Sequence, residues 1–144
     1  MSLTQNSSTC LPVLVNNEYG FDTREFGYSV AAIAPDAARL AYISGQSGQD
    51  SAGAFSPRFE DQVTQTYENL KHVLDMLGAA PEQVVKLTVY VVEHDQTKLP
   101  ILSAATKRVF DTQLPAQTLV PVPCLALEQM QFEVDAVVAR FERL

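Results

Sequence analysis

The sequence contains few cysteines and no long apolar run. Cys10 and Cys124 are its only cysteines, and two so widely separated cysteines form neither a disulfide framework nor a metal-binding motif. We therefore expect reduced thiols and no metal or other cofactor. No window approaches the roughly 18 apolar residues that a membrane-spanning helix needs, and the polar residues 1–9 do not resemble a signal peptide. These absences predict a soluble cytoplasmic protein that does not bind membranes.

Basic residues are also scarce. The chain has 10 Lys and Arg residues against 17 Asp and Glu residues, which gives a formal net charge of -7. A surface with this charge repels a phosphate backbone on average. The densest basic spot, Lys107-Arg108, lies within a predicted helix, so we expect no nucleic-acid partner.

Motifs of several large enzyme classes are missing. The sequence has no G-x-S-x-G elbow, no phosphate-binding loop and no G-x-G-x-x-G. His72 lies off the apolar stripe of a predicted helix and is expected to be exposed. His94 lies in a predicted loop between two acidic residues, and we interpret it as an ordinary polar residue of that loop rather than as a catalyst.

The apolar residues that are present suffice for one domain. Hydrophobic residues make up 47% of the 144 residues, which is enough for a core of ordinary size. We expect a flexible N-terminal tail at 1–9 and a single domain at 10–144.

Two segments have helical periodicity. The first is expected at 58–77, with Ser56 as its cap, Pro57 at its first position and Gly78 as its stop. Its apolar stripe consists of Phe59, Val63, Tyr67, Leu70, Val73, Leu74 and Leu77. The second is expected at 99–110, with Leu102, Ala105 and Val109 buried.

Other segments alternate as strands do. A short strand is expected at 11–17, and longer ones at 28–34, 39–45, 84–92, 117–122 and 131–141. Residues 35–38 are expected to form a hairpin turn between two of them. The strand 84–92 has an aliphatic face that consists of Val85, Leu87, Val89 and Val91.

The main elements follow the order β-β-α-β-α-β-β, which predicts an α+β fold. Two helices can cover only one face of such a mixed sheet. The other face is half apolar, so we expect further subunits to bury it.

Three polar residues are candidates for chemistry. Ser44 lies at a strand end, where it is either a functional group or a turn residue. Glu133 and Asp135 share one strand face and are expected roughly 7 Å apart. They are solvated if that face is open, and their pKa values are perturbed if it is an interface.

Six stretches in order resemble the Rid family, the reactive intermediate deaminases, also called the YjgF family. They cover about residues 26–139 and read FGYSVA, LAYISGQ, FEDQVTQTYENLKHVLDMLGA, VVKLTVYVVE, RVFDTQLPAQTLVPV and FEVDAVVA. The resemblance implies a chorismate-mutase-like fold and a homotrimer with small-molecule clefts between its subunits. The RidA members of this family hydrolyse enamines and imines such as 2-aminoacrylate to a keto acid and ammonia.

The resemblance also implies roles for particular residues. Tyr28 and Ser44 match substrate-binding positions, and Glu133 matches the glutamate that holds the attacking water. RidA has an arginine that binds the substrate carboxylate where this chain has Gln117, and often a cysteine where it has Leu119. Glutamine carries no charge and cannot offer the planar charged fork of arginine.

We therefore expect a hydrolase that acts on a small imine, enamine or amide and has weak or no activity on 2-aminoacrylate. The alternative is a trimeric ligand-binding or regulatory protein without catalysis. A cation from elsewhere, at Arg24, Arg39 or Arg58, would restore carboxylate binding. Family members have also been labelled endoribonucleases, which the net charge of -7 argues against.

Overall fold

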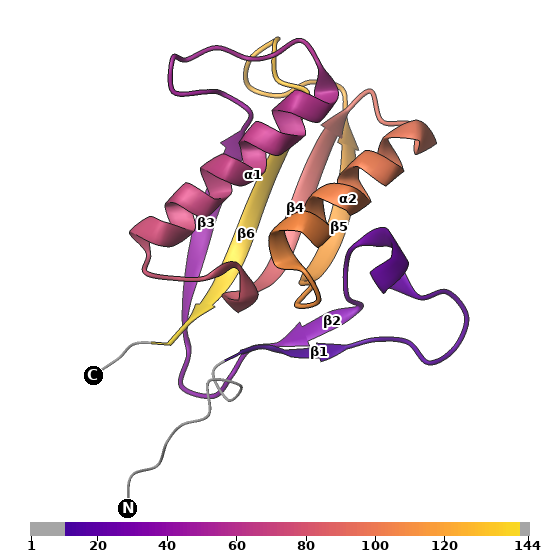
Figure 1. Ribbon diagram of the computed structural model, residues 1–144, viewed down its shortest axis with the longest axis vertical. Coiled ribbons are helices and arrows are strands. Elements are labelled where there is room, and N and C mark those ends of the chain that lie inside the picture. The colour runs from indigo at the N-terminus through magenta and orange to yellow at the C-terminus, as the bar shows by residue number, and fades with distance from the viewer. Residues whose placement is uncertain (1–10, 142–144) are drawn as a thin grey trace, which may run out of the picture.

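The computed structural model describes residues 11–141, so the expected tail at 1–9 and Cys10 lie outside the described residues. Its two α-helices are α1 (Phe59–Met76) and α2 (Leu99–Phe110). Its strands are β1 (Val13–Val15), β2 (Ala31–Ile33), β3 (Arg39–Ser47), β4 (Val84–Val92), β5 (Ala116–Val122) and β6 (Phe132–Arg140). Short 3-10 helices form at Thr23–Phe26 (η2), Pro81–Gln83 (η3) and Gln96–Lys98 (η4). Figure 1 shows this arrangement.

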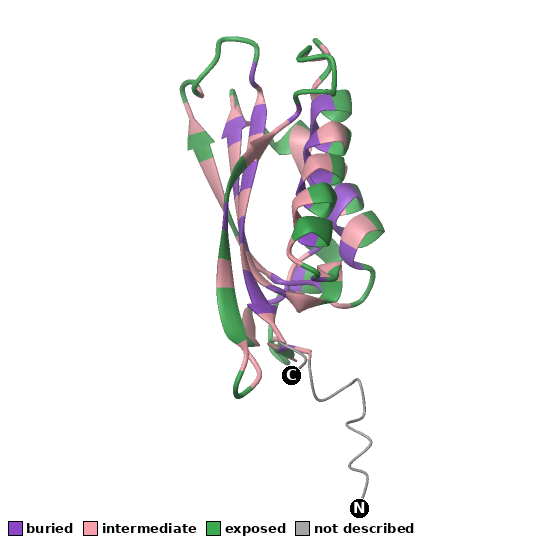
Figure 2. Ribbon diagram, turned by 90° about the vertical axis from the view of Figure 1, so that its left-hand side faces the viewer, coloured by how far each residue is buried: buried purple, intermediate pink, exposed green. Residues whose placement is uncertain are grey.

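Both α-helices pack on one face of the main sheet (Figure 2). The sheet has the strand order β3-β6-β4-β5, in which β4 and β5 are parallel and the other pairs are antiparallel. The core between the layers includes the fully buried Tyr67, Leu70, Phe110, Phe132 and Val134. The expected mixed sheet with helices on one face is therefore confirmed.

The opposite face of the sheet is open and carries apolar side chains. Tyr42 on β3 is 75% exposed and pairs with Val137 of β6. Leu40, two residues before Tyr42, is also exposed. A single chain thus leaves a partly apolar sheet face in water, as the alternation of its strands predicts.

The two ends of α1 differ in how well the sequence predicts them. Gly78 has a φ of 64° and follows the last turn of the helix, which confirms it as the stop. The cap expected at Ser56 is wrong, because the N-cap position is Arg58. The Ser56 hydroxyl instead accepts the Arg58 N–H and donates to Asp61, so it forms a turn just ahead of the helix.

The hairpin expected between 28–34 and 39–45 does not form. The turn at 35–38 is present, with a 3.3 Å hydrogen bond from the Ala38 N–H to the Pro35 carbonyl. However, β2 pairs with β1 in a separate two-stranded sheet, and β3 pairs with β6. Turn residues determine where the chain reverses, whereas the burial of strand faces determines the pairing partners.

The aliphatic face expected for β4 is wrong at its first position. Val84 is fully buried, and Val85 is only half-buried. The pairing with β6 shifts register between Val84 and Lys86, so a bulge interrupts the alternation there. From Leu87 onward the expected face is confirmed.

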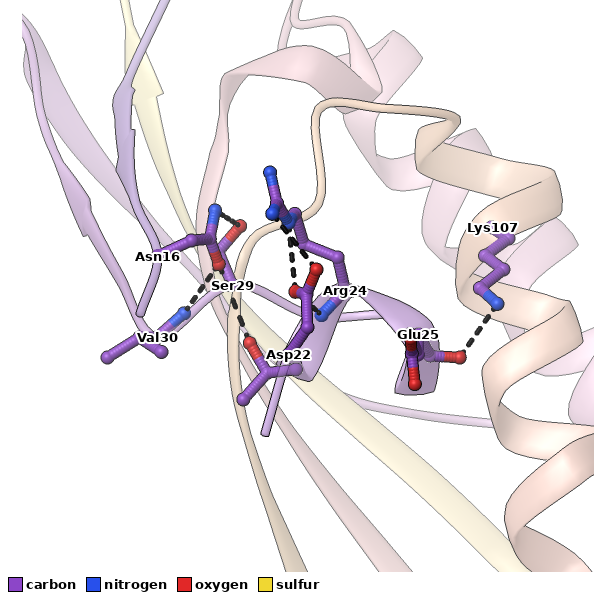
Figure 3. A network of polar contacts seen from close by, with 8 residues as sticks. Asn16, Asp22, Arg24, Glu25, Ser29, Val30 and Lys107 are labelled. Atoms are coloured by element: carbon purple, nitrogen blue, oxygen red, sulfur yellow. Dashed lines mark hydrogen bonds and ion pairs between the residues drawn. The ribbon is translucent and has the colours of Figure 1, made fainter. Parts of the chain in front are cut away.

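The segment 21–28 lies against α2 and is fixed there by polar contacts. The Ser103 hydroxyl donates to the Phe26 carbonyl at 2.9 Å. The Lys107 ammonium donates to the Glu25 carbonyl at 2.7 Å, as Figure 3 shows. Gly27 has a φ of 85° and sits so close to α2 that an added Cβ would overlap Thr106. Only glycine combines this backbone conformation with so close an approach.

Asn16 connects this segment to the small sheet. Its side-chain carbonyl accepts the Val30 N–H at 3.3 Å and the Thr23 hydroxyl at 3.5 Å (Figure 3). Its amide donates to the Ser29 hydroxyl at 3.4 Å. Ser29 also bridges Ala116, which places the end of the segment beside β5.

We expect Gly27→Ala to destabilise the protein more than the matched control Gly20→Ala. Both glycines have positive φ, which costs an alanine about 1–2 kcal/mol. Gly20 has open space around it, whereas a Cβ at Gly27 meets α2, and such overpacking adds about 1–3 kcal/mol. Urea unfolding at fixed protein concentration measures both. Equal losses of stability would show that the segment does not pack on α2.

Candidate active site

A pocket of about 300 Å³ lies between the segment 21–28, α2 and β5. It brings together three residues that the sequence singled out, namely Tyr28, Gln117 and Leu119. Its remaining lining residues are Phe21, Phe26, Leu99, Leu102 and Ser103. Its volume lies at the lower end of the range for small-molecule sites.

Gln117 and Leu119 point into this pocket because of the way β5 pairs with β4. Gln117 pairs with Leu87 and Leu119 pairs with Val89, and residues paired in this way point to the same side of a sheet. Leu87 and Val89 are buried beneath the helices. Gln117 and Leu119 therefore lie on the helix side, at the strand that borders the pocket.

The pocket is largely apolar and contains no charged lining residue among the described part of the chain. Phe21 and Phe26 form a tilted ring pair, with centroids 5.1 Å apart, and both rings are exposed. The Gln117 side-chain oxygen Oε1 is buried and has no hydrogen-bond donor within residues 11–141. An unpaired buried acceptor costs about 1–3 kcal/mol relative to a hydrated one.

None of the three arginines that could replace the missing cation lines this pocket. Arg24 makes a two-pronged ion pair with Asp22, at 2.9 Å for each of its two hydrogen bonds. This pairing raises the Arg24 pKa and lowers the Asp22 pKa. Arg58 lies 4.0 Å from a carboxylate oxygen of Glu60 at the start of α1, and Arg39 begins β3 at the far edge of the sheet.

Glu133 lies on the open face of the sheet. It pairs with Tyr90 of β4, which alternates with the buried Val89 and Val91. The Glu133 carboxylate lies against Gly45, where an added Cβ would overlap it. Burial raises the pKa of the Glu133 carboxyl, and the nearby charge of Asp135 raises that pKa further.

Two other groups surround this carboxylate. The Tyr90 hydroxyl donates to Asp135 at 2.9 Å, and this hydrogen bond is the main cause of a raised Tyr90 pKa. Ser44 is exposed next to Gly45, where the pairing of β3 with β6 shifts register. The predicted site residues thus form two groups. Tyr28, Gln117 and Leu119 line the pocket, and Ser44 and Glu133 lie on the open face.

The two groups lie on opposite faces of one sheet. Gln117 is in register with the buried Leu87, whereas Glu133 is in register with the outward-facing Tyr90. The backbone of the sheet separates the two side chains, so one chain does not bring them to the same ligand.

The histidines take no part in either group. His72 is exposed on α1, as its position off the apolar stripe predicts. His94 lies in the turn after β4, half-buried, and its Nδ1 atom has no partner within the described chain. No cluster of metal-binding side chains occurs in residues 11–141, and no helix there is long and apolar enough to cross a membrane.

Sequence reasoning did not find the aromatic wall of the pocket. Phe21 precedes the four-residue 3-10 helix η2 and Phe26 ends it, and so short an element leaves no periodicity in the sequence that would mark them. Ser103 is on the side of α2 next to the buried stripe, and its contact with Phe26 depends on the chain fold. The one local signal is Gly27, which marks a close approach but not its partner.

Comparisons with known proteins match this chain to one family. The model of the endoribonuclease L-PSP family matches residues 24–140. A Rid-family protein of unknown function from Yersinia pestis, YyfB, shares 28% identity and a TM-score of 0.83, over 89% of this chain and 98% of that one. A comparison with curated proteins gives no match.

More distant solved structures share the fold. RidA from a Psychrobacter species has 23% identity and a TM-score of 0.64, over 91% of this chain and 94% of that one. The YjgF gene product of E. coli also has 23% identity and a TM-score of 0.64, over 79% of this chain and 88% of that one. With the match of the family model over most of its length, the chain belongs to the endoribonuclease L-PSP family, which includes the Rid proteins.

Proposed function

We propose that this protein is a deaminase-type hydrolase that acts on a small imine, enamine or amide in a cleft between subunits. The observation that carries this proposal is the division of the site residues between two faces of the sheet. The pocket of Tyr28 and Gln117 receives no carboxylate from residues 11–141, and the carboxylate of Glu133 lies on the other face of the sheet. In this arrangement the open face of a second copy packs against the β5 edge of the first copy, and it supplies its own Glu133 to the first copy's pocket.

A homotrimer is the assembly that we infer for this arrangement. The open face carries exposed apolar side chains, of which Tyr42 is the most exposed. Burying this surface against another copy is favourable, at about 25 cal/mol per Å² of apolar area. Three copies arranged in a ring then form three equivalent clefts, as the family resemblance implies.

The proposed chemistry needs a base and a water molecule. Glu133 of the second copy takes a proton from water, and the water oxygen bonds to the carbon of the C=N group. The π electrons of that bond move to nitrogen, which takes the proton that Glu133 removed from water. Glu133 then carries the proton of the new hydroxyl group to the nitrogen, and the C–N bond breaks with its electron pair leaving on ammonia as the C=O bond forms. The raised pKa of Glu133 makes it a stronger base than an ordinary glutamate carboxylate.

Gln117 determines which substrates this pocket accepts. A substrate carboxylate there would be desolvated without a cation, because no arginine or lysine is among its lining residues. Losing such an ion pair costs about 2–5 kcal/mol, a factor of tens to thousands in binding. Activity on 2-aminoacrylate is therefore weak or absent in this proposal.

A second function, non-catalytic ligand binding or regulation, is favoured by one observation, the neutral residue at position 117. It predicts that small amides or keto compounds bind without turnover.

Ribonuclease activity, which the family name suggests, fits less well. The net charge is -7, and Lys98 and Lys107 are both held by backbone carbonyls. Retention on RNA with a steep salt dependence would contradict this view.

Gln117→Arg tests the role of the pocket. We expect wild type to release little ammonia from 2-aminoacrylate generated in the cuvette, and Gln117→Arg to release it at least tenfold faster, because the arginine binds the carboxylate. Gln117→Met is the matched control, since it changes the side chain without adding charge. Rapid ammonia release by wild type would show that another cation binds the substrate. Inactivity of both wild type and Gln117→Arg would favour the binding protein.

Glu133→Gln tests whether the charged Glu133 carboxylate lowers the stability of the folded protein. A carboxyl with a raised pKa stabilises the folded state below its unfolded pKa, and this contribution is lost as the pH rises through the folded pKa. We expect Glu133→Gln to be more stable than wild type at pH 7, by less than about 1 kcal/mol because the group is partly solvated. The difference should disappear as the pH falls below 4.5. Urea unfolding across this range measures it, and lower stability of the variant at pH 7 would indicate a structural role.

Tyr42→Glu tests the interface. We expect the wild type to be a trimer in light scattering and Tyr42→Glu to dissociate, because the variant would bury a charge between copies. Met76→Glu is the matched control, since Met76 is 74% exposed at the end of α1, on the helix layer. A wild-type monomer, or a trimer of the Tyr42→Glu protein, would contradict the proposed assembly.

A further inference from the structure

The buried oxygen of Gln117 indicates what kind of group the pocket binds. Its Oε1 atom has no donor among the described residues, although it borders a pocket of about 300 Å³. Buried acceptors in folded proteins nearly always have a partner. A ligand that carries an N–H or O–H group would supply the missing donor from within the pocket.

The charges around the pocket restrict that ligand further. Within residues 11–141 no charged side chain lines the pocket, and the cations closest to it along the chain are engaged elsewhere. Arg24 pairs with Asp22, Lys98 donates to the Val92 and Glu93 carbonyls, and Lys107 donates to the Glu25 carbonyl. A carboxylate would meet the partial negative charge of Gln117 Oε1 without a compensating cation. A neutral N–H group would instead be stabilised there, and a positively charged one would be compensated by the Glu133 carboxylate that the second copy supplies in the proposed assembly.

The remaining walls favour an apolar body of the size of a ring. Phe21 and Phe26 leave 56% and 38% of their surface exposed, and the leucines of α2 and β5 complete the wall. A planar apolar group that packs on these rings removes both surfaces from water. Among the described residues of the lining, the other polar side chains are those of Tyr28 and Ser103.

We propose that the substrate is an imine without a carboxylate, whose carbon carries an aryl or branched alkyl group and whose nitrogen donates to Gln117 Oε1. This inference rests on the proposed hydrolase function and specifies its substrate class. The apolar group packs against Phe21 and Phe26. The neutral oxygen of Gln117 favours the protonated C=NH₂⁺ form, which is the form that water attacks more readily. Water then adds to the carbon, and ammonia leaves as described above.

Four small probes separate these contributions by binding alone. Benzamidinium, benzamide and benzoate share one ring and a planar head group, and acetamide lacks the ring. We expect benzamidinium and benzamide to bind the full-length protein, with benzoate and acetamide each at least tenfold weaker. Calorimetric titration at pH 7 measures all four. Benzoate binding as tight as benzamide, or no binding of benzamide, overturns the proposal.

Variants at position 117 test the hydrogen bond. Gln117→Met keeps the length of the side chain and removes the acceptor, so benzamide should bind about tenfold more weakly. Gln117→Glu keeps an acceptor and adds negative charge, so benzamidinium should bind at least tenfold more tightly. Gln96→Met, at an exposed glutamine of η4, is the control and should leave binding unchanged. Unaltered benzamide binding by Gln117→Met would contradict the assigned role of Oε1.

Turnover is measured separately, so that the two proposals fail independently. An amine oxidase converts benzylamine to benzaldimine in the cuvette, and ammonia release is followed with and without the protein. The expected binding order together with faster ammonia release supports both proposals. The expected binding order without faster release supports the ligand class and contradicts the hydrolase. Faster release with benzoate as the tightest probe supports the hydrolase and overturns the ligand class.

Discussion

The packing of α1 and α2 on a single face of the sheet divides the side chains of every strand into two sets. One set contacts the helices, as Leu87 and Val134 do, and the other set faces away. Gln117 belongs to the first set and Glu133 to the second, because each is in register with a residue of that set on β4. The separation follows from the alternation of side chains along a strand. A loop movement would not bring the two side chains together within one chain, so the proposed function requires a second copy.

The pocket depends on a second contact, between the segment 21–28 and α2. Two hydrogen bonds to backbone carbonyls and the close approach at Gly27 fix this segment, which supplies the aromatic rings and Tyr28. Gln117 comes from β5, an edge strand of the main sheet. The walls thus come from parts of the chain about 90 residues apart, so the stability of the site is coupled to that of the domain.

The helices and the buried faces of the strands could be predicted from the sequence because the burial of apolar side chains repeats with the geometry of each element. The stripe of α1 and the alternation of β6 are examples. The bulge at Val85 and the partner of β2 could not be predicted, because both depend on pairing between distant strands. The same limit applies to the site. The sequence shows a glutamine at position 117. That its side-chain oxygen is unpaired, and that it shares a pocket with Phe26, depends on the register of β5 and on the position of the segment 21–28.

The split between the two faces has a consequence for mixed assemblies of intact and damaged chains. In the proposed trimer each chain contributes its pocket to one cleft and its Glu133 to another. A chain altered at only one of these positions disables one cleft and leaves its other contribution usable by a neighbour. A chain that is altered at both positions but still assembles disables two clefts at once. In mixed trimers, loss at one position therefore lowers the number of working clefts in proportion to the share of altered chains, whereas loss at both positions lowers it with the square of the share of intact chains.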